Sequence, residues 1–183
     1  ISAYTEHGYS REALECYEQM QYQGTPMDVV TFACILKSCS AISSIEKGRE
    51  IHDNIMTWGL ERDVFLGNTL VDLYAKCGLL SGGENVFDKL QRRDVVSWNA
   101  MIKGHSTNHE ATLAIHYFEC MQAEGVLPDA ITFTCILSAC RHGKFVNKGQ
   151  VYFKLMMLKY GIVPSIDHFT CLVDLLGRGG RFG

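Results

Sequence analysis

Aspartates recur along the chain at a nearly constant distance, and each one precedes an apolar segment of similar sequence. The four aspartates lie 35, 31 and 35 residues apart: Asp28, Asp63, Asp94 and Asp129. The segments that follow begin VVTFACILKSC, VFLGNTLVDLY, VVSWNAMIKGH and AITFTCILSAC, and they align without gaps. A period in the thirties with this internal similarity predicts stacked supersecondary units rather than one globular core.

Longer shifts of the sequence against itself indicate the order of the units. A shift of 101 residues superimposes Thr31, Phe32 and Lys47-Gly48 on Thr132, Phe133 and Lys148-Gly149. A shift of 102 superimposes LVDL from Leu70 on LVDL from Leu172. We therefore expect one array over residues 1–183. Its expected units are a partial unit 1–28, complete units 29–63, 64–94, 95–129 and 130–165, and a partial unit 166–183.

Apolar residues at helical spacing predict two helices in each unit. In the unit from Val95, the first helix is expected at about residues 97–106, with Trp98, Met101 and Ile102 on one stripe. A polar turn at 107–109 leads to a second helix at about 111–124. A hairpin of this size cannot bury both faces alone, so the fold class is all-α, an α-solenoid in which neighbouring hairpins stack.

Composition excludes several classes of function. The net charge of -3 argues against binding nucleic acid chiefly by phosphate neutralisation. No C-x-x-C or H-x-E motif occurs, so we expect no metal and no cofactor. No apolar run approaches the roughly 18 residues of a membrane span, so no membrane partner is expected.

The eight cysteines leave two interpretations open. They could form disulfides, as in small secreted proteins. However, Cys34 with Cys39 and Cys135 with Cys140 occupy equivalent positions in equivalent units. Repeated positions favour small, reduced packing residues.

Several segments resemble those of plant organelle pentatricopeptide repeat proteins of the PLS class, in which standard, long and short units alternate. The segments that carry the resemblance are DVVSWNAMIKG from Asp94, EALECYEQMQYQG from Glu12, LVDLYAKCG from Leu70 and KYGIVPSIDHFTCLVDLLGRGGRF from Lys159. By this resemblance 29–63 and 130–165 are long units, 64–94 and 166–183 are short ones, and 95–129 is standard. It also implies a right-handed superhelix. GRGGRFG from Gly177 aligns on the turn of a short unit, so we expect a turn there.

The resemblance implies binding to single-stranded RNA, one nucleotide per repeat, read by the fifth and the last residue of each unit. Carried over by position, these residues pair Asn68 with Asp94 and Asn99 with Asp129. In the family an Asn with an Asp is the pairing for uridine, and an amide can both donate and accept at a pyrimidine edge. Two adjacent uridines, read 5′ to 3′ along the chain, are expected.

The remaining family positions give less readable pairs. They are Ala33 with Asp63, Thr134 with Ser165, and Asp28 and Thr170, whose partners would lie beyond the chain. The second residues of the units are expected to clamp bases by apolar contact: Val30, Phe65, Val96 and Ile131. For the aspartates, capping of the following helix is an alternative interpretation, and both roles are compatible.

The function implied is that of a sequence-specific RNA-binding array that positions an organelle transcript for C-to-U editing or other RNA processing. The last segment resembles the units that precede the C-terminal extension of editing factors, so we expect the C-terminal part of such a repeat array, in a mitochondrion or chloroplast. The chain is expected not to be an enzyme, since the zinc-binding motif of deaminases is lacking. Editing cofactor proteins or a deaminase domain outside the chain are expected partners. The alternative is a protein-binding helical-repeat scaffold.

Overall fold

The computed structural model of the protein describes residues 1–178, and every regular element in this range is a helix. The expected all-α class is therefore confirmed. The expected turn in GRGGRFG falls mostly on residues 179–183, which lie outside the described range. The helices are α1 (Ser2–Glu6), α2 (Ser10–Tyr22), α3 (Val29–Ala41), α4 (Ile45–Thr57), α5 (Val64–Lys76), α6 (Leu80–Lys89), α7 (Val95–Thr107), α8 (Ala111–Ala123), α9 (Ala130–Gly143), α10 (Val146–Leu158) and α11 (Ile166–Arg178).

The recurring aspartates cap four of the first helices, α3, α5, α7 and α9. Each side chain accepts a hydrogen bond from the backbone N–H three residues later, at 2.7 Å for Asp28, 2.9 Å for Asp63, 2.9 Å for Asp94 and 2.8 Å for Asp129. This bond satisfies one of the donors that a helix start leaves unpaired. It also explains why α7 begins at Val95, before the start that apolar spacing alone predicted.

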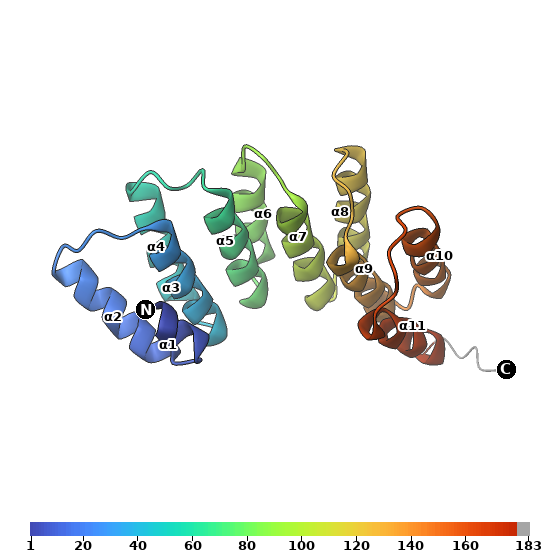
Figure 1. The fold of residues 1–183 in the computed structure, drawn as a ribbon, viewed down its shortest axis with the longest axis horizontal. Helices are drawn as coiled ribbons and strands as arrows, with labels where there is room; N and C mark the ends of the chain where they lie inside the picture. Colours follow the sequence, from blue (N-terminus) through green and yellow to red (C-terminus); the bar gives the residue numbers. More distant parts are fainter. Residues whose placement is uncertain (179–183) are drawn as a thin grey trace. The chain divides into compact units, whose positions relative to one another are not determined.

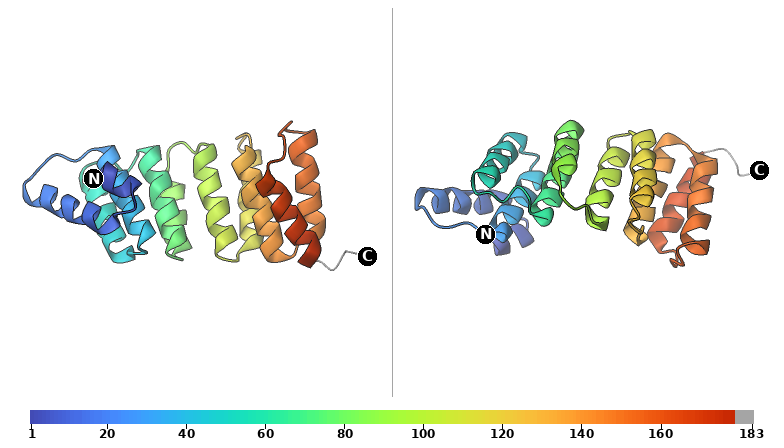
Figure 2. Two further views of the ribbon diagram at one scale, coloured as in Figure 1. Left: turned by 60° about the horizontal axis from the view of Figure 1, so that its bottom comes forward. Right: turned by 90° about the horizontal axis from the view of Figure 1, so that it is seen from above.

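The chain divides into two compact units, Ile1–Arg93 and the part from Asp94. Within the first, α1, α3 and α5 pack in sequence and each contacts its own second helix, α2, α4 or α6 (Figure 1). Within the second, α7, α9 and α11 pack in sequence, and α8 and α10 cover α7 and α9. Figure 2 shows this alternation of first and second helices in each unit from two further directions.

Glycines in two second helices admit a leucine from the next hairpin. A Cβ atom on Gly48 of α4 would come within 2.5 Å of Leu73 Cδ2 on α5. Gly149 of α10 faces Leu175 of α11 in the same way, and both leucines are at most 1% exposed. This contact accounts for the repeated glycine, Gly48 and Gly149, and for the repeated leucine, Leu73 and Leu175.

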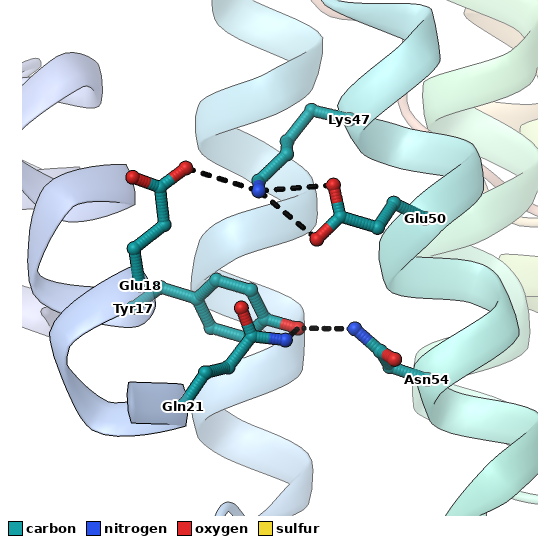
Figure 3. A network of polar contacts seen from close by, with 6 residues as sticks. All are labelled: Tyr17, Glu18, Gln21, Lys47, Glu50 and Asn54. Atoms are coloured by element: carbon teal, nitrogen blue, oxygen red, sulfur yellow. Dashed lines mark hydrogen bonds and ion pairs between the residues drawn. The ribbon is translucent and has the colours of Figure 1, made fainter. Parts of the chain in front are cut away.

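Long polar side chains join the second helices α2 and α4 (Figure 3). The hydroxyl of the buried Tyr17 accepts a hydrogen bond from Asn54 at 2.9 Å. Lys47 Nζ lies 3.0 Å from a carboxylate oxygen on each side, from Glu18 on α2 and from Glu50 on α4. Burial raises the pKa of Tyr17, so its phenol stays protonated at neutral pH. The polar contacts of its hydroxyl thus add to the apolar packing of its buried ring.

All eight cysteines are free thiols in the structure, which supports the packing interpretation. Cys39 and Cys140 occupy equivalent buried positions on α3 and α9. Burial raises the pKa of Cys39 to about 11 and that of Cys140 to about 12. Both side chains therefore remain neutral thiols near pH 7 and behave as small apolar residues.

We expect Gly83→Ala to raise the free energy of unfolding by about 0.5 to 1 kcal/mol, because glycine within a helix costs conformational entropy. A Cβ at Gly83 would meet its nearest neighbour, the Val71 carbonyl oxygen, at 3.6 Å, an ordinary contact. At Gly82 it would lie 2.7 Å from the Tyr74 ring, whose hydroxyl is held by His52 at 2.9 Å. Gly82→Ala should therefore give no gain. Urea unfolding of both variants tests this, and equal gains would contradict it.

Candidate nucleic-acid interface

The expected base-clamping residues lie at the starts of four first helices, and all four are about half exposed. Each is the second residue of its helix, and three residues later on the same face comes the expected base-reading residue. The exposed fractions are 55% for Val30, 51% for Phe65, 54% for Val96 and 61% for Ile131. The helices α3, α5, α7 and α9 thus each present an apolar side chain to solvent beside a candidate base-reading residue.

Asn99 and Asp129 are hydrogen-bonded to each other across two successive first helices of the second compact unit. Asn99 Nδ2 on α7 donates to Asp129 Oδ1 at 3.0 Å, just before α9. Asn99 is only 7% exposed, so its amide is largely fixed by protein contacts. The predicted pair of a fifth and a last residue is therefore in direct contact.

Asp129 serves two neighbours with one carboxylate oxygen. Its Oδ1 caps α9 through the backbone N–H of Thr132 at 2.8 Å and also accepts from the Asn99 amide. Because a carboxylate can only accept, it orients the Asn99 amide with nitrogen towards the cap. Helix capping and orientation of the amide thus coexist in one residue.

The other predicted pairs differ from this one. Asn68 belongs to the first compact unit and Asp94 to the second, so their pairing stays a prediction. Ala33 is buried and has no polar side chain to set beside Asp63, which caps α5. Among the residues without a partner position, Asp28 caps α3, and Thr170 is exposed and donates to the Ile166 carbonyl oxygen at 2.8 Å.

Thr134 and Ser165 are connected through a third residue, His168, which is 1% exposed. The Ser165 backbone N–H donates to His168 Nδ1 at 3.0 Å, so Nε2 carries the ring proton. Nε2 then donates to the Ala130 carbonyl oxygen at 2.8 Å and lies 3.2 Å from Thr134 Oγ1. The two predicted positions are therefore linked by a bridge rather than by direct contact.

Sequence reasoning missed the third residue of the following unit, which is Thr132 at one pair and His168 at the other. A signal was present for Thr132, because Asp-x-x-Thr is a helix-start pattern in which the hydroxyl returns to the aspartate. No simple pattern points to His168. Side chains three residues after the last position thus belong to the site.

A cation lies beside one of the apolar residues. Lys37 Nζ is 5.7 Å from the centre of the Phe65 ring, a cation–π distance. Lys37 is the ninth residue from Val29, and Lys103 is the ninth from Val95, so the sequence repeats this placement. A positive charge beside an exposed ring suits a ligand with aromatic bases and a phosphate backbone.

No group of three or more His, Cys, Asp or Glu side chains among residues 1–178 is arranged to hold a metal ion. None of the described helices combines the length and apolar character needed to cross a bilayer.

Models of a known repeat family match several segments of the chain. Models of the PPR repeat match residues 1–25 and 68–95, and a model of the PPR repeat family matches 93–142. The chain belongs to the pentatricopeptide repeat family. Membership in this family identifies it as a helical-repeat segment and not as an enzyme domain.

Relatives of the pentatricopeptide repeat chain are much longer than it is. Pentatricopeptide repeat-containing protein At2g33680 of Arabidopsis thaliana is 41% identical over 99% of this chain, which covers 25% of that protein. The putative mitochondrial pentatricopeptide repeat-containing protein At1g77010 of the same plant is 37% identical over 98% of this chain, which covers 26% of that protein. The chain thus spans about a quarter of the length of the relatives it matches.

Among solved structures, the chain is similar to maize pentatricopeptide repeat protein PPR10. The PPR10 structure in complex with an 18-nucleotide psaJ RNA element matches with a TM-score of 0.80 and 16% sequence identity. The match covers 96% of this chain and 26% of that one. At this identity the likeness establishes the helical-repeat fold.

We expect Asn99 and Asp129 to be energetically coupled. In a Trp58→Phe background, where Trp98 is the only tryptophan, Asp129→Ala should lower the free energy of unfolding by about 1 to 2 kcal/mol through loss of the cap and of the amide bond. A double-mutant cycle with Asn99→Ala should give a coupling of about 0.5 to 1.5 kcal/mol.

The matched control for this cycle pairs Asn99→Ala with Asp28→Ala. Asp28 caps α3 in the other compact unit and shares no partner with Asn99. The two effects should add, because distant sites without shared partners do so within about 0.5 kcal/mol. Additivity in the Asn99 and Asp129 cycle as well would refute the coupling.

Proposed function

We propose that the chain binds single-stranded RNA with one base per repeat, as part of the repeat array of a longer plant pentatricopeptide repeat protein. The observation that carries the proposal is the hydrogen-bonded pair of Asn99 and Asp129 beside half-exposed apolar side chains. The fold match to PPR10, a protein whose structure was solved with RNA, supports the same assignment.

The chemistry of the Asn99 amide suits a uridine. One Nδ2 proton is donated to Asp129, which leaves the second proton and an Oδ1 lone pair for a ligand. Uridine presents an N3–H donor beside carbonyl acceptors, so one donor and one acceptor on the protein complete the contact. We assign the same role to Asn68 with Asp94, which makes two adjacent uridines the proposed target.

The apolar second residues supply sequence-tolerant contact in this proposal. An exposed Val30, Phe65, Val96 or Ile131 side chain can pack on the face of any base, because every base has a π-face. Lys37 beside Phe65 adds positive charge where the RNA backbone would run. We propose that two other pairs, Ala33 with Asp63 and Thr134 with Ser165, contact the RNA without preferring a particular base.

The finer assignments rest on the resemblance of segments. We propose the PLS class, with repeat units at 29–63, 64–94, 95–129 and 130–165 and partial units at either end. We also propose that the array positions an organelle transcript for C-to-U editing or other processing. Editing proteins or a deaminase domain outside this chain would then perform the chemistry. One relative is named as mitochondrial, which supports an organelle location.

The base assignment is tested with 12-nucleotide RNAs that carry UU, UC, CU or AA in an otherwise identical adenosine background. At fixed ionic strength, we expect UU to bind about tenfold or more tightly than AA, because a good base contact contributes about 1 to 3 kcal/mol. Asp129→Asn should reduce the preference for UU over UC and leave that for UU over CU unchanged. Equal binding of UU and AA by the unaltered chain would favour a protein-binding scaffold instead.

The clamp assignment makes a separate prediction. Phe65→Ala should weaken binding of all these RNAs by about 1 to 3 kcal/mol, since stacking on an aromatic side chain is sequence-tolerant. The Phe65 side chain is 51% exposed, so its truncation should change thermal stability little. Phe65→Tyr is the matched control, because it keeps the ring. Unchanged RNA affinity in Phe65→Ala, measured by fluorescence anisotropy, would remove Phe65 from the interface.

A further inference from the structure

We propose that Thr132 is a positioning residue for base recognition by Asn99, and this inference rests on the RNA-binding function proposed above. Thr132 is the third residue of the following unit and is fully buried. Its Oγ1 lies 2.6 Å from Asn99 Oδ1, a shorter distance than that between the Asn99 amide and Asp129. The side chain thus acts on a base through Asn99 and not by touching the RNA.

The number of available protons fixes the direction of this bond. Thr132 Oγ1 accepts from the Asp129 backbone N–H at 3.1 Å and has one proton to donate. Asp129 Oδ1, at 2.9 Å, already accepts the Thr132 backbone N–H and an Asn99 Nδ2 proton. Asn99 Oδ1, which is closer, therefore takes the hydroxyl proton.

The Asn99 amide is consequently held at both ends. Asp129 fixes its nitrogen, and Thr132 fixes its oxygen. One Nδ2 proton and one Oδ1 lone pair remain, and both are fixed in direction. This matters for uridine against cytidine, because uridine N3 donates whereas cytidine N3 accepts. An amide tethered only by Asp129 keeps its nitrogen towards the cap but can turn about that hydrogen bond, so it distinguishes the two bases less well.

A second pair also places the third residue of one unit beside the fifth residue of the preceding unit, although both side chains there donate to the Ala130 carbonyl oxygen. His168, the third residue after Ser165, reaches back to Thr134, the fifth residue of the preceding unit, with 3.2 Å between Nε2 and Oγ1. Where the fifth residue is the apolar Ala33, the corresponding third residue is Leu66, which has no polar side-chain atom either. In these cases the third residue matches the polarity of the fifth residue.

Helix capping by itself does not account for the contact with Asn99. Thr31 at the start of α3 donates to its capping Asp28 at 2.7 Å, just as Thr132 approaches Asp129. Thr31 therefore offers a matched control, in which the same hydroxyl can be removed from the same kind of helix start. Thr132→Ser keeps the hydroxyl and serves as the conservative variant.

The test compares Thr132→Val, Thr132→Ser and Thr31→Val with the unaltered chain on the UU, UC and CU RNAs. For Thr132→Val we expect the ratio of the UC dissociation constant to the UU dissociation constant to fall about three- to tenfold, because this variant loses one buried hydrogen bond. The ratio of CU to UU should stay unchanged, and the other two variants should keep both ratios. A merely structural role would weaken all RNAs equally.

An unchanged UC to UU ratio in Thr132→Val would overturn the inference while leaving the RNA-binding proposal intact. Absence of any uridine preference in the unaltered chain would instead overturn both. A measurement without RNA tests the positioning role separately from RNA binding. It follows the rate at which the side-chain amide protons of Asn99 exchange with solvent, with their NMR signals assigned through their loss in Asn99→Ala. They should exchange with solvent faster in Thr132→Val than in Thr132→Ser, and equal rates would contradict positioning.

Discussion

The hydrogen bond by which an aspartate caps the start of α3, α5, α7 and α9 is the interaction on which the remaining structure depends. Four aspartates accept the backbone N–H three residues later, and α3, α5, α7 and α9 each begin at the next residue. This fixes where the exposed second residue and the fifth residue lie on the helix. The spacing of one residue type therefore determines the placement of every candidate recognition side chain on these helices.

One of these carboxylates also joins successive units. Asp129 is shared between the α9 backbone and the Asn99 amide, whereas the exposed Asp28 binds only within its own helix start. Hydrogen bonds from the Thr31 hydroxyl and backbone lower the pKa of Asp28, and it remains ionised at neutral pH. Stability of a helix start and orientation of a recognition side chain thus depend on the same atoms at Asp129, and selection on one constrains the other.

The sequence predicted the helical class, the alternation of helices and the capping role of the aspartates, because these follow from local periodicity. It also predicted the buried stripe of α7, where Trp98, Met101 and Ile102 are at most 2% exposed. The contacts of Thr132 and His168 were not predicted, because they depend on how closely two helices approach. The partner of Asn68 across the unit boundary stays a prediction for the same reason.

The close packing of Leu73 on Gly48, and of Leu175 on Gly149, limits how the hairpins of such chains can be recombined. Each glycine lies in the second helix of one hairpin and each leucine in the first helix of the next, so a cut at the unit boundary between them, Asp63 or Ser165, separates the two residues. A hairpin grafted beside an unrelated hairpin would carry the glycine or the leucine of this contact without its partner residue. Exchange of a second helix together with the first helix that follows it would keep both residues of this contact.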